Sequence, residues 1–417
     1  RSRIDTYPRL FHTTQTTGSS YSTAVATALA PISLIQGAMF QYVSFDMLWW
    51  TLIAYFVVRL ANTSDPRWWL GIGGVIGLGM QTKYTMAFCV AGVVAGVLAT
   101  PVRRQLASPW LWAGVLLSIA IFVPNVVWQA RHGFISLEFL NSIHARDVRI
   151  GRTDGFLVEQ LYITSTPLAA LLWIPGFAAL ALDRRFERCR MLAWMYGVPL
   201  VLFILAKGRG YYLGAAYPML FAAGAVAWQH WSESWPRRMR VAAAAALWTV
   251  LVASGLAVGS LVTPVAPVHS AVWEISSSLH PDFREQLGWP ELVDEVARIY
   301  HALPEQERAV TGIYASNYGE AGAIDLYGPA RGLPPSFSGV NTYWLRGFPS
   351  PPPATLIVVG SRREDLERVF DSVDEAGRTP NPFDIVNEET RDHPVIYVCR
   401  GMTVPWPDVW AKARSFG

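Results

Sequence analysis

The chain has 417 residues, of which 52% are hydrophobic and only 16% are charged, whereas a water-soluble protein of this size carries about 25% charged residues. Its net charge of +3 is too small to indicate a nucleic-acid partner, and its three cysteines do not suggest a disulfide framework. Charged side chains are nearly absent from residues 23–58 and common after residue 282, which predicts a membrane part followed by a water-soluble part.

Apolar stretches that can form membrane helices fill the first two thirds of the chain. A spanning helix needs about 20 mostly apolar residues, and several of these stretches are shorter. They cover residues 22–40, 47–60, 68–80, 84–99, 109–128, 157–182, 191–206, 211–228 and 241–262. The sequence therefore predicts a multi-pass α-helical membrane domain over residues 22–262. It follows an N-terminal segment, residues 1–21, which we expect to be truncated because it begins with Arg1 rather than Met.

Two isolated ionisable residues interrupt the apolar stretches. Asp46 stands at the mouth of one stretch, and Lys83 stands between two others with no acidic residue near it in the sequence. Placing a charge at membrane depth costs free energy, so such residues are functional candidates. Alternatively, Lys83 marks a helix-hairpin turn and extends to the lipid headgroups, and Asp46 is a helix N-cap.

Arginines in the connecting loops predict the orientation of the membrane domain. They occur on alternate loops and share one side if every stretch crosses: Arg59, Arg67, Arg103, Arg104, Arg184, Arg185, Arg188, Arg190, Arg237, Arg238 and Arg240. By the positive-inside rule this side is the cytoplasm. Asp46, Lys83 and residues 129–156 and 207–212 then face the other side, so we expect the sparse ionisable residues to meet at the outer face.

Two outer segments carry further candidate residues. Residues 129–149 mix charged and apolar side chains at helical spacing, which predicts an amphipathic helix along the membrane surface. In this segment His132 is a candidate metal ligand, with a surface histidine as the alternative. Lys207 and Arg209, in the second segment, are either phosphate contacts or ordinary cations flanking a span.

The last part of the chain, residues 263–417, predicts a small extracytoplasmic α/β domain. Apolar residues share one face of a helix that begins at Pro290. Strands are expected at residues 309–314, 354–359 and 393–399, and helices at 319–326 and 363–370. This part of the sequence has no glycine-rich phosphate loop, no zinc-ligand spacing and no serine elbow.

Three motifs together resemble a known family. They are Gly-Leu-Gly-Met-Gln-Thr-Lys-Tyr-Thr at residues 77–85, Pro-Asn-Val-Val-Trp-Gln-Ala-Arg-His-Gly-Phe at 124–134 and Lys-Gly-Arg-Gly-Tyr-Tyr-Leu-Gly-Ala-Ala-Tyr-Pro at 207–218. Their order and spacing over residues 22–228 resemble the polytopic C-type glycosyltransferases of family 39, in the branch related to protein-mannosyltransferases and aminoarabinose transferases.

The resemblance implies a reaction and a location. Such enzymes move a sugar from a polyprenyl-phosphate donor to a lipid, glycan or protein acceptor, at the outer face of the bacterial inner membrane. Cations would hold the leaving phosphate, and the candidates are Lys83, Arg131, Lys207 and Arg209. Asp46 would be the catalytic carboxylate, which accepts the proton of the acceptor or holds a divalent metal.

The chain departs from the family pattern at one place. The family's first aspartate lies in a loop upstream of every residue present here, so we expect the chain to be a fragment of an active enzyme. One alternative is a truncated, non-catalytic membrane scaffold of the same fold. Another is a transporter or flippase for an amphipathic substrate, since intramembrane charges also mark transport paths, although the sequence shows no inverted repeat.

Overall fold

The computed structural model describes residues 17–39 and 41–417. The described residues divide into two compact units. The membrane unit comprises those up to Ser136 together with Ala145–Ala266, and the α/β unit comprises Leu137–His144 and Pro267–Gly417. Most of the predicted N-terminal segment, residues 1–21, lies outside the described part of the chain.

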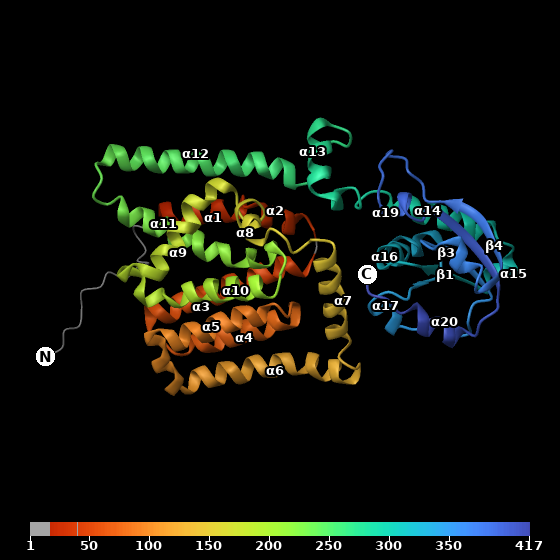
Figure 1. The fold of residues 1–417 in the computed structure, drawn as a ribbon, viewed down its shortest axis with the longest axis horizontal. Helices are drawn as coiled ribbons and strands as arrows, with labels where there is room; N and C mark the ends of the chain where they lie inside the picture. The colour runs from red at the N-terminus through yellow and green to blue at the C-terminus, as the bar shows by residue number, and fades with distance from the viewer. Residues whose placement is uncertain (1–16, 40) are drawn as a thin grey trace. The chain divides into compact units, whose positions relative to one another are not determined.

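The membrane unit is built from α-helices, many of them side by side (Figure 1). In chain order they are α1 (Thr17–Ala28), α2 (Pro31–Ala38), α3 (Tyr42–Thr63), α4 (Trp68–Thr82), α5 (Met86–Ala99), α6 (Pro109–Arg131), α7 (Ile135–Arg149, shared with the α/β unit), α8 (Phe156–Tyr162), α9 (Ala170–Leu182), α10 (Met191–Leu205), α11 (Tyr217–Trp231) and α12 (Arg237–Val262). Short 3₁₀ helices lie between them: η1 (Pro101–Ala107), η2 (Pro167–Ala169), η3 (Arg184–Cys189) and η4 (Gly210–Ala216).

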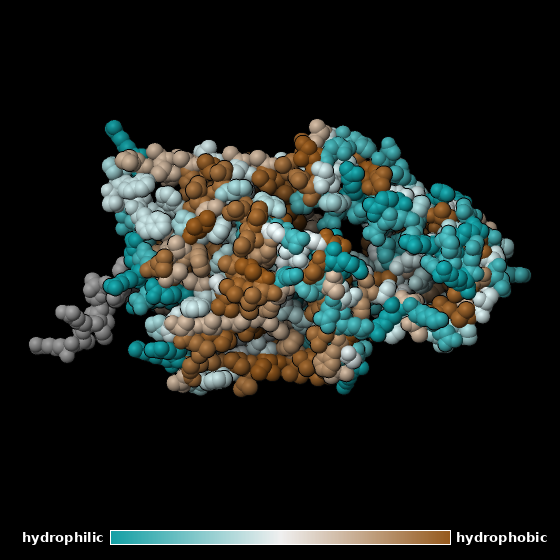
Figure 2. Space-filling view, in the orientation of Figure 1, coloured by the Kyte–Doolittle hydropathy of each residue, from teal (hydrophilic) through white to brown (hydrophobic). Residues whose placement is uncertain are grey.

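Several of these helices have the length and composition of membrane spans. Among the described residues, α3, α6 and α12 are each long and apolar enough to cross a membrane. Two bent pairs bring the number to as many as five if each pair is one span: α5 with η1, and α8 with η2 and α9. Hydrophobic side chains cover much of the visible surface of these helices (Figure 2). The predicted fold class, a polytopic helical part before a small α/β part, is confirmed.

Two predicted spans are interrupted in the structure. The stretch 22–40 divides into α1 and α2 at Pro31, because a proline disfavours helical geometry in the residue before it, and Ala30 is extended. The stretch 157–182 bends by 92° between α8 and α9. At this bend the Thr164 hydroxyl donates to the carbonyl oxygen of Gln160 at 2.7 Å, an alternative to continuing the helix.

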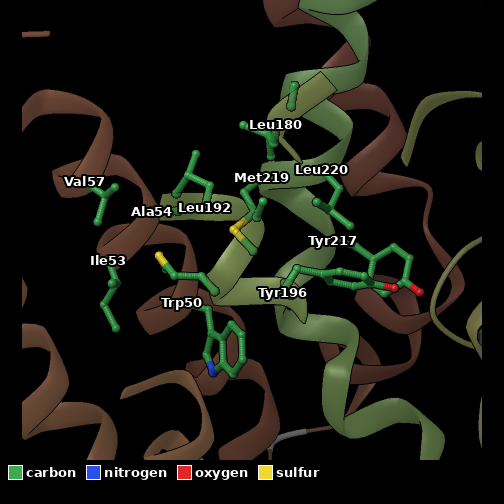
Figure 3. Close-up of a cluster of buried hydrophobic side chains, with 14 of the residues drawn as sticks. Trp50, Ile53, Ala54, Val57, Leu180, Leu192, Tyr196, Tyr217, Met219 and Leu220 are labelled. Atoms are coloured by element: carbon green, nitrogen blue, oxygen red, sulfur yellow. The ribbon is translucent and has the colours of Figure 1, made fainter. Parts of the chain in front are cut away.

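The core of the membrane unit lies where α3, α9, α10 and α11 meet (Figure 3). Trp50 and Ile53 of α3 point into it and are 2% and 0% exposed. Leu180, Leu192 and Leu220 contribute one buried side chain from each of the other three helices. Of these helices, α3 also carries the candidate residue Asp46.

Glycines allow two of these helices to pack backbone against backbone. A Cβ atom on Gly224 of α11 would lie 2.0 Å from the carbonyl oxygen of Leu172 in α9. In the same contact, a Cβ on Gly176 of α9 would lie 2.1 Å from the Leu220 carbonyl oxygen. Small residues at such crossings permit the close approach that helix packing in membranes uses.

The α/β unit contains a five-stranded mixed sheet with short helices around it (Figure 1). Its strands are β1 (Thr311–Ala315), β2 (Ser336–Phe337), β3 (Thr355–Val359), β4 (Phe370–Arg378) and β5 (Val395–Met402). Its helices are α13 (Ala271–Leu279), α14 (Trp289–Ala302), α15 (Glu305–Arg308), α16 (Tyr318–Tyr327), α17 (Thr342–Leu345), α18 (Arg363–Leu366), α19 (Glu388–Arg391) and α20 (Trp406–Ala413).

The strand order is β2-β1-β3-β5-β4. β1 is parallel to β2 and β3, whereas β5 is antiparallel to both β3 and β4. Leu292 of α14 and Ile324 of α16 pack on one face of the sheet, and Trp410 of α20 packs on the other. Coverage on both sides explains why every residue of β3 is buried, as expected for a central strand.

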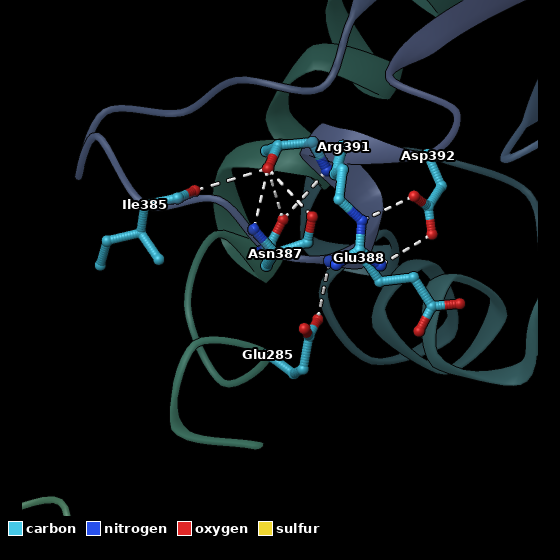
Figure 4. Close-up of polar contacts among 7 residues, drawn as sticks. Glu285, Ile385, Asn387, Glu388, Arg391 and Asp392 are labelled. Atoms are coloured by element: carbon cyan, nitrogen blue, oxygen red, sulfur yellow. Dashed lines mark hydrogen bonds and ion pairs between the residues drawn. The ribbon is translucent and has the colours of Figure 1, made fainter. Parts of the chain in front are cut away.

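The three predicted strands are confirmed, but β2 and β4 were not predicted. The helix expected at residues 363–370 is wrong in its second half, because α18 ends at Leu366 and β4 begins at Phe370. Polar contacts hold the chain around α19 (Figure 4). The Asn387 side chain accepts the N–H of Thr390 at 3.0 Å, which caps α19.

Candidate active site

Asp46 and Lys83, isolated in the sequence, form an ion pair in the membrane unit. Lys83 Nζ lies 3.8 Å from Asp46 Oδ2, and the two side chains are 8% and 2% exposed. Lys83 occupies the C-cap of α4, in the short break before α5. The N-cap explanation for Asp46 is wrong, because α3 begins at Tyr42 and Gln41 is its N-cap.

This ion pair leaves hydrogen-bonding capacity unused. A separation of 3.8 Å is too long for a hydrogen bond. Within the described part of the chain, neither Lys83 Nζ nor Asp46 Oδ1 has a hydrogen-bond partner, although both atoms are buried. Buried charges of this kind are costly unless further polar groups satisfy them. The arrangement is therefore suited to receive an additional polar group.

Three tyrosine rings surround the Lys83 ammonium. Its Nζ lies 4.0 Å from the ring centroid of Tyr212, 5.5 Å from that of Tyr211 and 5.6 Å from that of Tyr42. The negative faces of aromatic rings attract a cation at these distances. The tyrosines thus surround an ammonium that has no hydrogen-bond partner among the described residues, which leaves its N–H groups available to a ligand.

A second cation, Arg209, lies beside this cluster. Its Nε donates to Asp147 Oδ2 at 2.6 Å, and its Nη1 donates to the Tyr211 hydroxyl at 3.3 Å. Because the Tyr211 ring also contacts Lys83, the two cations share one aromatic neighbour. The geometry places a guanidinium and an ammonium together at one end of the helix bundle, a pair suited to an anion with several oxygens.

The residues on either side of Arg209 are glycines because the structure leaves no room for a side chain at these positions. A Cβ on Gly208 would lie 2.8 Å from a ring atom of Phe203, and a Cβ on Gly210 would lie 1.8 Å from Glu159 Oε2. The Gly210 carbonyl oxygen accepts a hydrogen bond from Gln160 Nε2 at 2.9 Å. The Gly-Arg-Gly sequence therefore fixes the backbone that carries the Arg209 side chain.

The second sequence motif positions the first. The Tyr84 hydroxyl donates to Asn125 Oδ1 at 2.8 Å and accepts from Gln129 Nε2 at 2.9 Å. Tyr84 directly follows Lys83, so these bonds from α6 hold the break that carries the ammonium. All three motifs therefore meet at the same end of the membrane unit.

The other three candidate residues, Lys207, Arg131 and His132, lie at the surface and outside this cluster. Lys207 is exposed and has a left-handed backbone with φ of 47°. Arg131, in the last turn of α6, is exposed. The His132 ring stacks on Trp128 with centroids 4.2 Å apart, and its Nδ1 lies 2.7 Å from the Trp128 carbonyl oxygen. The structure thus brings Asp46, Lys83 and Arg209 together and leaves these three side chains at the surface.

The described residues form no cluster of possible metal ligands. They include no group of three histidine, cysteine, aspartate or glutamate side chains that could hold a metal ion. Asp46, the candidate carboxylate ligand, faces the Lys83 ammonium instead. The divalent metal and the ligand role of His132 therefore stay predictions.

Sequence reasoning missed two groups of neighbours. No pattern in the sequence singles out Tyr211 and Tyr212, yet their rings contact Lys83. Asp147, the partner of Arg209, was one of many charges in an amphipathic segment. Asp147 differs from the other charged residues of α7 because its side chain is buried, with 3% exposed. This burial is visible only in the folded structure.

The α/β unit contains a buried carboxylate of a different kind. Glu320 accepts the backbone N–H groups of Ser316 and Asn317 at 3.1 and 3.2 Å, as part of the capping box of α16. Burial raises the pKa of Glu320 to about 7. This contact pattern explains Glu320 by helix capping.

Comparisons with known proteins place part of the chain in context. Residues 8–128 match the family described as dolichyl-phosphate-mannose-protein mannosyltransferase; this segment contains Asp46 and Lys83. The chain is 24% identical over 263 residues to the lipid A galacturonosyltransferase RgtD of Rhizobium johnstonii. That alignment covers 60% of this chain and 50% of the relative, so the chain spans about half the length of this curated relative. No solved structure matches the chain.

Proposed function

Because residues 8–128 carry a domain of the dolichyl-phosphate-mannose-protein mannosyltransferase family, a family of polytopic C-type glycosyltransferases, we propose that this protein is a membrane glycosyltransferase. It takes a sugar from a polyprenyl-phosphate donor and transfers it to an acceptor. The single observation that carries the proposal is the meeting of Asp46, Lys83 and Arg209 at one end of the helix bundle.

The two cations suit the leaving group of this reaction. As the bond between the sugar and the phosphate breaks, negative charge develops on the phosphate oxygens. Preorganised cations stabilise such charge most strongly where water is excluded, and Lys83 is 8% exposed. Arg209 adds a guanidinium, whose N–H groups not used by Asp147 and Tyr211 can donate to a phosphate.

Asp46 suits the role of general base. The acceptor oxygen attacks the anomeric carbon of the sugar, and the bond from that carbon to the phosphate oxygen breaks with its electrons on the phosphate. The acceptor loses its proton in this step, and Asp46 Oδ1, which lacks a hydrogen-bond partner among the described residues, accepts it. Lys83 then stays with the phosphate, which replaces Asp46 as its principal anionic neighbour.

The proposed location is the bacterial inner membrane, with the site at the outer face and the α/β unit extracytoplasmic. The arginine-rich loops support this orientation. Phe186 of the loop between α9 and α10 stacks edge-on against His230 at the end of α11, so two basic loops are adjacent. They lie at the opposite ends of α10 and α11 from Arg209, and positive loops favour the cytoplasmic side.

The acceptor is a lipid, a glycan or a protein. The two matched names differ on this point, since one specifies a protein acceptor and the other lipid A. The assay below therefore offers both classes.

A transfer assay tests the proposal. Full-length protein in nanodiscs receives a radiolabelled polyprenyl-phosphate sugar and a membrane extract that contains lipid and protein acceptors. We expect label to leave the carrier, and Asp46→Asn to reduce the rate at least 100-fold. The matched control is Asp183→Asn, a carboxylate at the opposite end of the bundle that pairs with Arg185. Equal rates in the two variants would remove Asp46 from the site, and passage of intact labelled carrier across the bilayer without release would indicate a transporter.

A further inference from the structure

A groove with a volume of about 510 Å³ lies between α9 and α10 of the membrane unit. Its walls are almost entirely apolar and include Phe177 of α9 and Trp194 of α10. The groove opens at the surface, since Trp194 is 40% exposed and Val201, another lining residue, is 53% exposed. It is separate from the cluster around Lys83, because none of the residues of that cluster lines it.

The groove follows α10 along most of its length. From its N-cap residue Arg190 to Leu202, the lining residues recur at intervals of three and four positions, so they share one face. Twelve residues of helix rise by roughly 18 Å. An elongated apolar chain therefore fits the groove better than a compact ligand does.

Gly197 lines the groove, and no close helix contact requires a glycine at this position. A Cβ on Gly197 would meet nothing closer than a Phe177 ring atom at 4.0 Å. By contrast, a Cβ on Gly92 of α5 would lie 2.8 Å from the Met195 backbone, so that glycine serves the contact between α5 and α10. Glycine inside a helix costs stability relative to alanine. At Gly197 the visible consequence of the missing side chain is the space of the groove.

A cation stands at one end of the groove. Arg190 lines it, and the buried Nε of this side chain has no hydrogen-bond partner in the described ranges. The surrounding segment, residues 183–190, contains four arginines against one aspartate and one glutamate, a net charge of +2. This end is the start of α10, whereas Arg209 follows the other end of the helix.

We propose that this groove binds an anionic phospholipid, with one acyl chain along α10 and the phosphate on Arg190. The charge selects an anionic headgroup, because each arginine near a membrane surface attracts anionic lipid. The apolar wall accepts the chain. Since the charged end lies at the opposite end of α10 from the proposed donor site, the bound lipid is distinct from the sugar donor.

Lipid retention measured by native mass spectrometry tests this site. The full-length protein is released from nanodiscs that contain phosphatidylglycerol or phosphatidylcholine with matched acyl chains. We expect retained phosphatidylglycerol in preference to phosphatidylcholine, and roughly tenfold weaker retention in Arg190→Gln. Gly197→Leu and Val201→Trp fill the groove and should abolish retention of that lipid. The control is Arg237→Gln, an exposed arginine at the start of α12 that lines no part of the groove.

The variants also protect the test against misfolding. Val201 is exposed, so a larger side chain there does not enter the core, and the Arg190 and Arg237 variants keep the apolar surface intact. Equal retention in the two arginine variants would overturn the proposal, as would retention of phosphatidylcholine as strong as that of phosphatidylglycerol. A dimer that Gly197→Leu dissociates would show that a second copy of the chain, rather than a lipid, occupies the groove.

Discussion

Neutralising the buried ion pair in both partners separates a catalytic role from a structural one. At 3.8 Å and an effective dielectric constant of about 20, the attraction between Asp46 and Lys83 is about 4 kcal/mol. Removal of one partner leaves the other charge buried and unpaired, which typically costs about 3–5 kcal/mol. We therefore expect Asp46→Asn and Lys83→Met each to lower the free energy of unfolding by roughly 3 kcal/mol.

The double variant should recover stability but not activity. With both charges absent, no unpaired ion remains, so the loss of stability should be clearly smaller than the sum of the two single losses. Sugar transfer should stay abolished in all three variants, because the phosphate-binding cation or the base is missing in each. The assays are detergent-titrated unfolding and release of label from a polyprenyl-phosphate sugar.

A control pair at the other end of the bundle calibrates both measurements. Asp183 and Arg185 lie 2.8 Å apart but are 20% and 46% exposed, and an exposed pair contributes at most about 1 kcal/mol. Neutralising both should change neither stability nor transfer appreciably. Wild-type transfer in the Asp46→Asn/Lys83→Met double variant would show that the pair serves only the fold and has no catalytic role.

Three further predictions concern Arg209, Glu320 and the glycines of the helix bundle. Arg209→Gln should raise the KM for the polyprenyl-phosphate donor roughly tenfold, and an unchanged KM in steady-state transfer would exclude Arg209 from the donor site. Glu320→Gln should stabilise the α/β unit above pH 7. In the folded wild type the pKa of Glu320 is raised from 4.5 to about 7, so the folded state favours the protonated carboxyl. The free energy of unfolding therefore falls as the pH rises from about 4.5 to about 7. Glutamine stays neutral and keeps the capping acceptor, so hydrogen exchange in the strands should lose part of its pH dependence beyond the intrinsic rate. The rest comes from Glu389, because burial raises the pKa of that carboxyl to about 7 as well; a dependence as large as that of the wild type would contradict this cause. Gly224→Ala should lower the yield of folded protein because its Cβ meets the Leu172 carbonyl oxygen, whereas Gly197→Ala should be tolerated; equal yields by fluorescence-detected size exclusion would count against the close packing of α9 on α11.

The fold class could be predicted because the distribution of apolar and charged residues along the chain is enough to identify it. Low charge and long apolar stretches predict membrane helices, and a late rise in charge predicts a water-soluble unit. The interruption at Pro31 was readable in principle, since a proline restricts the residue before it. The bend near Thr164 was harder to predict, because it depends on a hydrogen bond from the Thr164 hydroxyl to the carbonyl oxygen of Gln160 in the previous turn.

The missed strands have a physical explanation. β4 reads Phe-Asp-Ser-Val-Asp-Glu-Ala-Gly-Arg, and only Phe370 and Val373 of it are buried, so the strand shows no apolar alternation and its apolar signal is weak. β2 has two residues, too few for any periodicity. Strands of this kind are fixed by their neighbours in the sheet, here β5 and β1, and not by their own composition.

The candidate site was predictable in its charges but not in its contacts. Isolated charges in apolar sequence identified Asp46 and Lys83, since burial of such groups needs a reason. Their pairing joins residues 37 positions apart in sequence (83 − 46), through helix packing that no local pattern reveals. The same holds for Arg209 and Asp147, whose contact joins two segments with separate sequence signals.

An experimental structure of the protein with polyprenyl phosphate bound would show directly whether Lys83 and Arg209 hold the donor. We expect the phosphate within hydrogen-bonding distance of Lys83 Nζ and of the Arg209 guanidinium, with Asp46 Oδ1 open toward the sugar side. A phosphate bound elsewhere, with the Asp46–Lys83 pair unchanged and no ligand beside it, would exclude this site as the donor site.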